Sequence, residues 1–304
     1  MARATETTPS IKHRAGGRSG SSWQRALRGY LLLPHLVPVI VVELATLGFA
    51  AIAWGGVPPP RLLLPLLLGM LGGQLAIGAT NELADLPFDA VAKPDKPLPS
   101  GDVSLRGARA MAIAGLAMMS ACGLWLGLPA FALLALGTGL GVAYDLWLKR
   151  TVWSWLPYLL ALPLLPVWVF LALGRPEPRL LLLYPLGALA TVGVHFAQAL
   201  PDVASDRASG QQTPTSRLGS RSAFALAWLA ALSAPLLAHL AAARLGADAP
   251  SSAIVAAAAL AVLSLAGNLA VLRVDRKLGI AACFPLVALA TLASGLAWTA
   301  TIAR

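Results

Sequence analysis

The strongest constraint on this sequence is a succession of apolar segments, each long enough to cross a lipid bilayer. A membrane helix needs about 20 mostly apolar residues to span the hydrocarbon core. The 304-residue chain contains nine such segments. We therefore expect an all-α, polytopic membrane bundle of nine transmembrane helices. The predicted spans lie near residues 30–54, 61–84, 107–127, 129–147, 153–173, 180–201, 222–245, 252–272 and 279–301.

The composition and the basic residues agree with this topology. The chain is 58% hydrophobic and 12% charged, whereas soluble domains average about 25% charged residues. Of its 23 Lys and Arg residues, 18 fall on the side that holds the N-terminus when nine spans alternate. The positive-inside rule then places the N-terminus in the cytoplasm. We expect a multi-pass protein of the cell (plasma) membrane, with no nucleic-acid partner and no obligatory protein partner.

The first 29 residues differ from the rest of the chain. They are rich in Ser, Gly, Thr and Arg and contain no apolar run. Such a composition predicts a disordered segment, here a basic cytoplasmic arm. Residues 30–304 are predicted to form one nine-helix transmembrane domain, because the spans leave no length for a separate soluble domain.

The first polar stretch, NELADLPFDAVAKPDKPLPSG at residues 81–101, follows the second predicted span. Asn81, Asp85 and Asp89 are spaced i, i+4 and i+8, so they share one face of a helix. Lys93 and Lys96 follow among three prolines. Carboxylates followed by cations suit a divalent metal shared with phosphates, because Mg²⁺ usually takes one or two carboxylates and substrate oxygens. A solvated loop between membrane helices is the alternative.

A second polar stretch, DVASDRASGQQTPTSRLG at residues 202–219, follows the sixth predicted span on the same membrane side. It carries Asp202 and Asp206 at i and i+4. Polar residues continue into both spans: Gln74 on the second, His195 and Gln198 on the sixth. Polar groups inside a bilayer usually face a bundle interior or a cavity and often mark function. Interhelical hydrogen bonding is the alternative for His195 and Gln198, and also for the aspartates of the two clusters.

Two acidic clusters with nearby cations suit the ionisation of a diphosphate ester. Two Mg²⁺ ions, each held by one cluster, would neutralise the leaving diphosphate. Lysines and arginines would hold its remaining oxygens. A dry apolar cavity behind the site would shield the allylic carbocation from water. Asp85 and Asp202 are the candidate catalytic residues.

These stretches carry a family resemblance. NELADLPFD resembles the first aspartate motif, N-D-x-x-D-x-x-x-D, of the UbiA superfamily of intramembrane prenyltransferases. AKPDKPLPSG is similar to the basic Pro-rich stretch that follows that motif, and DVASDRASGQQTPTSRLG resembles the second motif. Tyr144 and Lys149 in YDLWLKR resemble the Tyr and Lys after the fourth helix. The sequence departs from the family pattern at Glu82, where Asp is usual, and at Asp145, where a small residue is usual.

The resemblance implies a central cavity that opens to the cytoplasm and to lipid. It implies that Mg²⁺ is the cofactor, and that a polyprenyl diphosphate and a small acceptor are the substrates. The superfamily uses aromatic acids, quinone precursors, tetrapyrroles, glycerol phosphates and sugar phosphates as acceptors, and we expect an aromatic one here. It also assigns residues to roles. The implied metal ligands are Asn81, Asp85, Asp89, Asp202 and Asp206; the implied diphosphate-binding residues are Lys93, Lys96, Lys149 and Arg207; the implied cavity-lining residues are Gln74, Tyr144, His195 and Gln198.

Three function classes remain open at this point. The first is Mg²⁺-dependent transfer of a prenyl group to a small acceptor, with release of diphosphate. The second is an intramembrane terpene cyclase, which would use the same ionisation site without an acceptor. The third is a cation transporter. Transporters place their acidic residues near the membrane midplane, whereas the acids here lie at the cytoplasmic ends of the spans, so the sequence favours the transferase.

Overall fold

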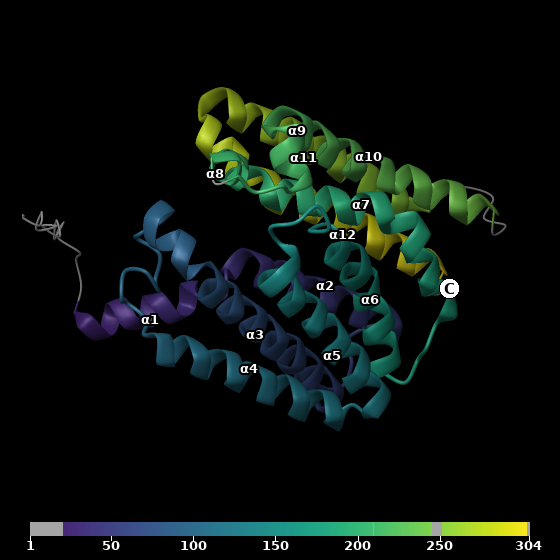
Figure 1. The fold of residues 1–304 in the computed structure, drawn as a ribbon. Helices are drawn as coiled ribbons and strands as arrows, with labels where there is room; N and C mark the ends of the chain where they lie inside the picture. The colour runs from purple at the N-terminus through teal and green to yellow at the C-terminus, as the bar shows by residue number, and fades with distance from the viewer. Residues whose placement is uncertain (1–20, 209, 245–250, 303–304) are drawn as a thin grey trace, which may run out of the picture.

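The computed structural model describes residues 21–208, 210–244 and 251–302, and this part of the chain is helical throughout, without strands (Figure 1). Eight of its helical stretches are long and apolar enough to cross a membrane. The fifth predicted span corresponds to α6 (Leu156–Ala172), an apolar helix of 17 residues that falls just short of that length. The predicted all-α membrane bundle is therefore confirmed, and the count reaches nine only when α6 is included.

The remaining elements follow the predicted order, with short helices between the long ones. They are α1 (Ser22–Leu32), α2 (Leu36–Trp54), α3 (Pro60–Ala92), α4 (Leu105–Trp125), α5 (Leu128–Ala143), the π-helix η1 (Tyr144–Leu148), the 3₁₀ helices η2 (Pro178–Leu182) and η3 (Leu200–Asp202), α7 (Leu183–Ala199), α8 (Val203–Ala208), α9 (Pro214–Leu218), α10 (Ser220–Arg244), α11 (Ser252–Val274) and α12 (Arg276–Ile302).

The N-terminal region corrects two expectations. Residues 22–29, which the sequence assigned to the disordered arm, belong to helix α1; residues 1–20 of that arm lie outside the described residues. The first span does not begin at residue 30 either. The helix breaks at His35, whose φ of 58° lies in the left-handed region, and α2 begins at Leu36. A side chain with a Cβ enters this region at a steric cost, so the break separates α1 from the first spanning helix.

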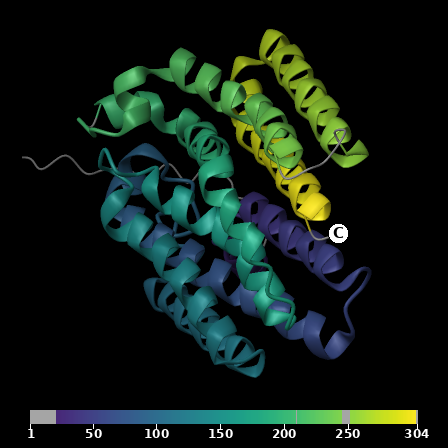
Figure 2. The same cartoon turned by 90° about the vertical axis from the view of Figure 1, so that its right-hand side faces the viewer.

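Figures 1 and 2 show the long helices in two groups, with α2–α6 on one side and α7–α12 on the other. Glycines allow close helix contacts inside each group. A Cβ added at Gly72 of α3 would lie 2.6 Å from the Gly115 oxygen of α4, and one added at Gly193 of α7 would lie 2.5 Å from the Ala230 Cβ of α10. Small residues at such crossings are typical of membrane bundles, because they let the backbones pack closely.

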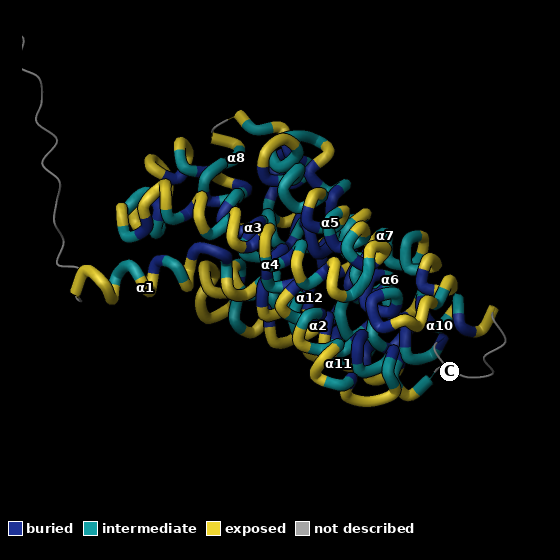
Figure 3. The backbone as a smooth tube through the Cα atoms, turned by 90° about the horizontal axis from the view of Figure 1, so that it is seen from below, coloured by how far each residue is buried: buried dark blue, intermediate teal, exposed yellow. Residues whose placement is uncertain are grey.

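The two groups meet in a buried apolar core, while apolar side chains also cover the outer surface. The core includes Phe49 of α2, Trp168 of α6 and Trp298 of α12. Figure 3 shows exposed positions along the outer faces of the helices. Many of them are large and apolar, such as Ile113 and Leu263, which is the pattern expected for a surface that faces lipid.

Helix α3 extends beyond the predicted end of the second span. Its 33 residues correspond to about 50 Å at 1.5 Å per residue, whereas the hydrocarbon core is about 30 Å thick. The helix continues past residue 84, through Pro87, to Ala92. The first acidic motif therefore lies on a regular helix that extends out of the apolar part of the bundle.

The second motif has a less regular backbone than the sequence indicated. The i, i+4 spacing of Asp202 and Asp206 after the sixth predicted span would place both acids on one face if that helix continued through them. The α-helix α7 instead ends at Ala199, and a 3₁₀ turn that contains Pro201 separates it from α8. Asp202 closes that turn and Asp206 lies in α8. The break redirects the chain after His195 and Gln198, so the face that these residues share with the acids is only approximate.

Candidate active site

A cavity of about 1050 Å³ lies between the two groups of helices. Its inner wall is apolar and includes Phe49, Trp168 and Trp298. Its polar residues come from α3, the loop after it, η1, α7, η3 and α8, elements on both sides of the bundle. The sequence-predicted residues that line it are Gln74, Asn81, Asp85, Asp89, Lys93, Lys96, Tyr144, Lys149, His195, Gln198, Asp202 and Asp206.

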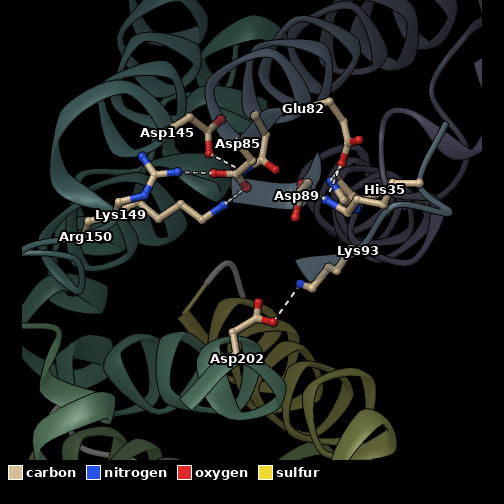
Figure 4. A network of polar contacts seen from close by, with 11 residues as sticks. His35, Glu82, Asp85, Asp89, Lys93, Asp145, Lys149, Arg150 and Asp202 are labelled. Carbon is tan, nitrogen blue, oxygen red and sulfur yellow. Dashed lines mark hydrogen bonds and ion pairs between the residues drawn. The ribbon is translucent and has the colours of Figure 1, made fainter. Parts of the chain in front are cut away.

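Asp85 lies at the centre of the first acidic cluster and is 8% exposed. Two cations from the end of η1 and the turn after it contact this carboxylate: Lys149 Nζ donates to Oδ2, and Arg150 Nη2 donates to Oδ1 over 2.6 Å (Figure 4). The Arg150 guanidinium also lies 4.0 Å from the centre of the Phe88 ring. Arg150 was not among the predicted site residues, although its position beside Lys149 was a usable signal.

Lys96 joins two buried acids of α3. Its Nζ donates to Glu82 Oε1 over 2.6 Å and to Asp89 Oδ2 over 2.7 Å. Burial acts to lower the pKa of Lys96, but hydrogen bonds and charge from the two carboxylates outweigh it and raise that pKa, so the amine stays protonated. Glu82, 2% exposed, also contacts His35 Nε2 at 3.1 Å and does not line the large cavity. Glu82, which stands where the first motif usually has Asp, is therefore paired with Lys96 and His35 rather than lining the large cavity.

Lys93 bridges the two acidic clusters. Its Nζ lies 2.7 Å from Asp202 Oδ1, and both side chains are about 40% exposed, with values of 43% and 40%. Figure 4 shows the bridge between the end of α3 and η3. The bridge brings the two motifs, 109 positions apart in sequence, to one mouth of the cavity. Asp206 lines the same mouth.

Arg207 occupies a different position from the one predicted. It does not line the cavity. Its Nε donates to the Ser216 carbonyl, its Nη2 donates to the Arg217 carbonyl over 3.2 Å, and its guanidinium packs on Gly219. The residue therefore holds the loop before α10, and the structure does not bring it to the diphosphate-binding residues.

That loop instead contributes hydroxyl groups that the sequence analysis missed. Thr213 and Thr215 are buried and line the cavity. Thr213 Oγ1 also accepts a hydrogen bond from the Ser216 backbone N–H at the start of α9. The TPTS pattern is a usable signal, because Thr before Pro is typical of a helix N-cap.

An aromatic wall lies deeper in the cavity. The ring centres of Tyr144 and Tyr158 are 5.4 Å apart, and those of Tyr158 and His195 are 5.0 Å apart. His195 is 1% exposed, and its Nε2 shares a hydrogen bond with Ser154 Oγ at 3.0 Å. Aromatic faces attract cationic groups. Tyr158 was not predicted, because it lies in an apolar segment without a polar stripe.

The donor set fits Mg²⁺ only when part of the coordination comes from a ligand. Within the described residues, no three His, Cys, Asp or Glu side chains are grouped so that they could hold a metal alone. Asp85, Asp89, Asp202 and Asp206 nevertheless present oxygen atoms at one cavity mouth. Mg²⁺ is usually bound by one or two carboxylates together with substrate phosphates and water, and this arrangement matches that pattern.

Comparison with known proteins identifies the family. The sequence profile of the UbiA prenyltransferase family matches residues 42–292, which include both acidic motifs and most of the bundle. The chain belongs to the UbiA prenyltransferase family. The resemblance of the motifs is thereby confirmed. In this UbiA-family chain, the cavity lined by both acidic motifs is the candidate active site.

Individual relatives match parts of the chain. A digeranylgeranylglyceryl phosphate synthase of Methanoculleus marisnigri is 39% identical over 83 residues, 27% of this chain and 28% of that protein. A homogentisate phytyltransferase of Synechocystis is 31% identical over 173 residues, 52% of this chain and 55% of that protein. The matched regions therefore cover about a quarter and about half of these relatives.

The fold is also found in solved structures. A UbiA homologue from Archaeoglobus fulgidus, solved with GPP and Mg²⁺ bound, superimposes with a TM-score of 0.62 at 18% sequence identity. The superposition covers 92% of this chain and 99% of that one. At this identity the likeness establishes a shared fold over nearly the whole chain.

Proposed function

We propose that this protein is an integral-membrane, Mg²⁺-dependent prenyltransferase that moves a prenyl group from a polyprenyl diphosphate to a small, aromatic acceptor. The observation that carries the proposal is the meeting of two acidic motifs, each paired with lysine or arginine, at the mouth of one apolar cavity. A phosphate group needs the cations, a metal needs the carboxylates, and a prenyl chain needs the apolar wall.

The comparisons support the substrate classes. The A. fulgidus homologue was solved with GPP and Mg²⁺, and the relatives are named as a digeranylgeranylglyceryl phosphate synthase and a homogentisate phytyltransferase. Homogentisate is aromatic, and the wall formed by Tyr144, Tyr158 and His195 offers ring faces to such an acceptor. The basic-residue pattern supports an orientation with the N-terminus in the cytoplasm and the cavity mouth on that side.

In this mechanism the carboxylates of the two motifs, Asp85 and Asp89 in the first and Asp202 and Asp206 in the second, would hold Mg²⁺ beside the diphosphate. Bound Mg²⁺ supplies positive charge that stabilises the diphosphate as it leaves. Three cations would then bind the phosphate oxygens. Lys93 would leave Asp202, and Lys149 and Arg150 would leave Asp85. These cations already lie at the mouth, so little reorganisation is needed.

The deeper cavity then controls the fate of the allylic carbon. The C–O bond breaks, and its electron pair leaves on the diphosphate oxygen. The aromatic wall with Tyr144, Tyr158 and His195 faces the positive carbon and excludes water. The acceptor forms the new bond to that carbon and loses a proton. Without an acceptor the carbocation would react with a double bond of the same prenyl group, which is the cyclase alternative.

The direct test is acceptor-dependent release of diphosphate by the purified protein from geranyl diphosphate and longer allylic diphosphates with Mg²⁺. We expect release to require an acceptor from a panel of aromatic acids, and we expect Asp85→Asn to abolish it. Asp275→Asn is the matched control, because Asp275 caps α12 outside the cavity and Asn caps helices equally well. Turnover without any acceptor, with a cyclic product, would replace transfer by cyclisation. No turnover with any diphosphate would refute both.

A further inference from the structure

The contact that sets this site apart joins α3 to the π-helix η1. Asn81 Nδ2 donates to Asp145 Oδ1 over 2.6 Å, between residues 64 positions apart. Asp145 lies beside Asp85 in Figure 4, and both Asn81 and Asp145 line the cavity. The family resemblance assigns Asn81 to the metal, and the proposed function gives Asp145 no role.

The chemistry of this contact fixes which end of the Asn81 amide faces the site. The Asn81 Nδ2 atom donates to a carboxyl oxygen of Asp145, so the amide turns its NH₂ group toward Asp145. The carbonyl oxygen Oδ1 of Asn81 then points away from Asp145. Mg²⁺ takes oxygen ligands, and an amide NH₂ group cannot serve as one. The orientation of this single amide therefore decides whether Asn81 is able to bind metal.

The surroundings show that this oxygen is available. Within the described residues, Asn81 Oδ1 has no hydrogen-bond partner and is not among the side-chain atoms sealed from solvent without one. Asp145, in contrast, is 2% exposed, and its own Oδ2 is buried without a partner. The sealed oxygen makes Asp145 a poor direct ligand, whereas Asn81 lines the cavity and its oxygen is not sealed from solvent.

The burial of Asp145 also calls for a functional reason. A buried carboxylate with one satisfied oxygen is costly, because desolvation is only partly compensated. The neighbouring cations Lys149 and Arg150 donate to Asp85 rather than to Asp145. Buried polar or charged residues whose hydrogen bonds are not all satisfied are concentrated at functional sites.

We propose that Asp145 is a positioning residue, which turns the Asn81 amide so that its oxygen faces the metal–diphosphate site. This inference rests on the proposed function and adds a specific device to it. Asp145 does not touch the substrate or the metal. Its effect passes through the amide, as outer-shell partners of metal ligands do, and loss of such a partner typically weakens metal binding 10–100-fold.

A double-mutant cycle tests this mechanism, because a carboxylate at position 81 presents oxygen whichever way it turns. Asp145→Ala should weaken metal binding when residue 81 is Asn. In an Asn81→Asp background the same change should strengthen binding, since it removes repulsion between two facing acids. Asp145→Asn should bind nearly as the wild type, because its amide oxygen still accepts from Asn81.

The readout is the dissociation constant of Mn²⁺, measured by electron paramagnetic resonance of the free ion in the presence of inorganic pyrophosphate. We expect an increase of about tenfold or more for Asp145→Ala, a change below about threefold for Asp145→Asn, and recovery in the Asn81→Asp, Asp145→Ala double variant. Thermal unfolding in detergent checks that each variant is folded.

Several results would overturn the inference. One is unchanged Mn²⁺ binding in Asp145→Ala; another is equal loss in Asp145→Asn and Asp145→Ala; a third is no recovery in the double variant. If Asp145→Ala fails to fold, the comparison of Asp145→Asn with Asn81→Asp decides: strong binding in the first and weak binding in the second supports the inference, and any other order overturns it. A wild-type protein that binds no Mn²⁺ with pyrophosphate would instead refute the proposed function itself.

Discussion

Replacing Lys93 or Lys96 with Met is predicted to change the thermal stability of the protein by different amounts. Lys96 is the cation that two buried acids share, since Glu82 is 2% exposed and Asp89 is 6% exposed. Lys93 forms a single bridge to Asp202, and both of these side chains are about 40% exposed, with values of 43% and 40%. The sequence alone assigns both lysines to the diphosphate.

The expected magnitudes follow from these burials. Removing one partner of a buried ion pair costs about 3–5 kcal/mol, because a charge stays buried without compensation. An exposed pair contributes only about 0–1 kcal/mol. At roughly 2 °C per kcal/mol for a large chain, we expect Lys96→Met to lower the melting temperature by about 6–10 °C. Lys93→Met should lower it by no more than about 2 °C.

The assay is thermal unfolding of the detergent-purified variants, followed by steady-state kinetics. Lys93→Met should keep its stability and raise KM for the prenyl diphosphate. A second variant isolates the cause: Glu82→Gln added to Lys96→Met removes one uncompensated charge and should restore part of the lost stability. The reasoning fails if the two lysine variants melt together, or if Glu82→Gln destabilises Lys96→Met further.

Two further predictions concern residues outside the ion pairs. Arg207 bonds to backbone carbonyls of the loop before α10, so Arg207→Met should lower the melting temperature and increase proteolysis of that loop. KM for the diphosphate should change little. A large rise in KM without a stability change would contradict this. Gly72→Val should strongly reduce the yield of folded protein, since its Cβ would lie 2.6 Å from the Gly115 oxygen, while Gly187→Val, with open space around it, should be tolerated.

Much of the fold was predictable from the sequence, because the membrane leaves few alternatives. Apolar segments of about 20 residues must be helices in lipid, and apart from the start of the first span and the extension of α3 the helices found match those segments. The helix break at His35 and the 3₁₀ turn before α8 were not predictable. Each depends on local backbone conformation that tertiary packing selects and that hydrophobicity does not report.

The site was predictable where periodicity carries the information. Asn81, Asp85 and Asp89 share a face of a regular helix, and that spacing is readable. Contacts between side chains on different helices of the bundle cannot be predicted from this spacing. The family resemblance assigned Arg207 to the diphosphate, yet its guanidinium bonds to the following loop. Asp145 was only a departure from the family pattern, because its partner lies 64 positions away.

The central claim is that the two motifs together hold two metal ions around one diphosphate. The most direct test counts Mn²⁺ bound per chain in the presence of inorganic pyrophosphate, for the wild type and for Asp85→Asn and Asp202→Asn. The account predicts about two ions in the wild type and about one in each variant. A single ion in the wild type, or an unchanged count in either variant, would contradict it.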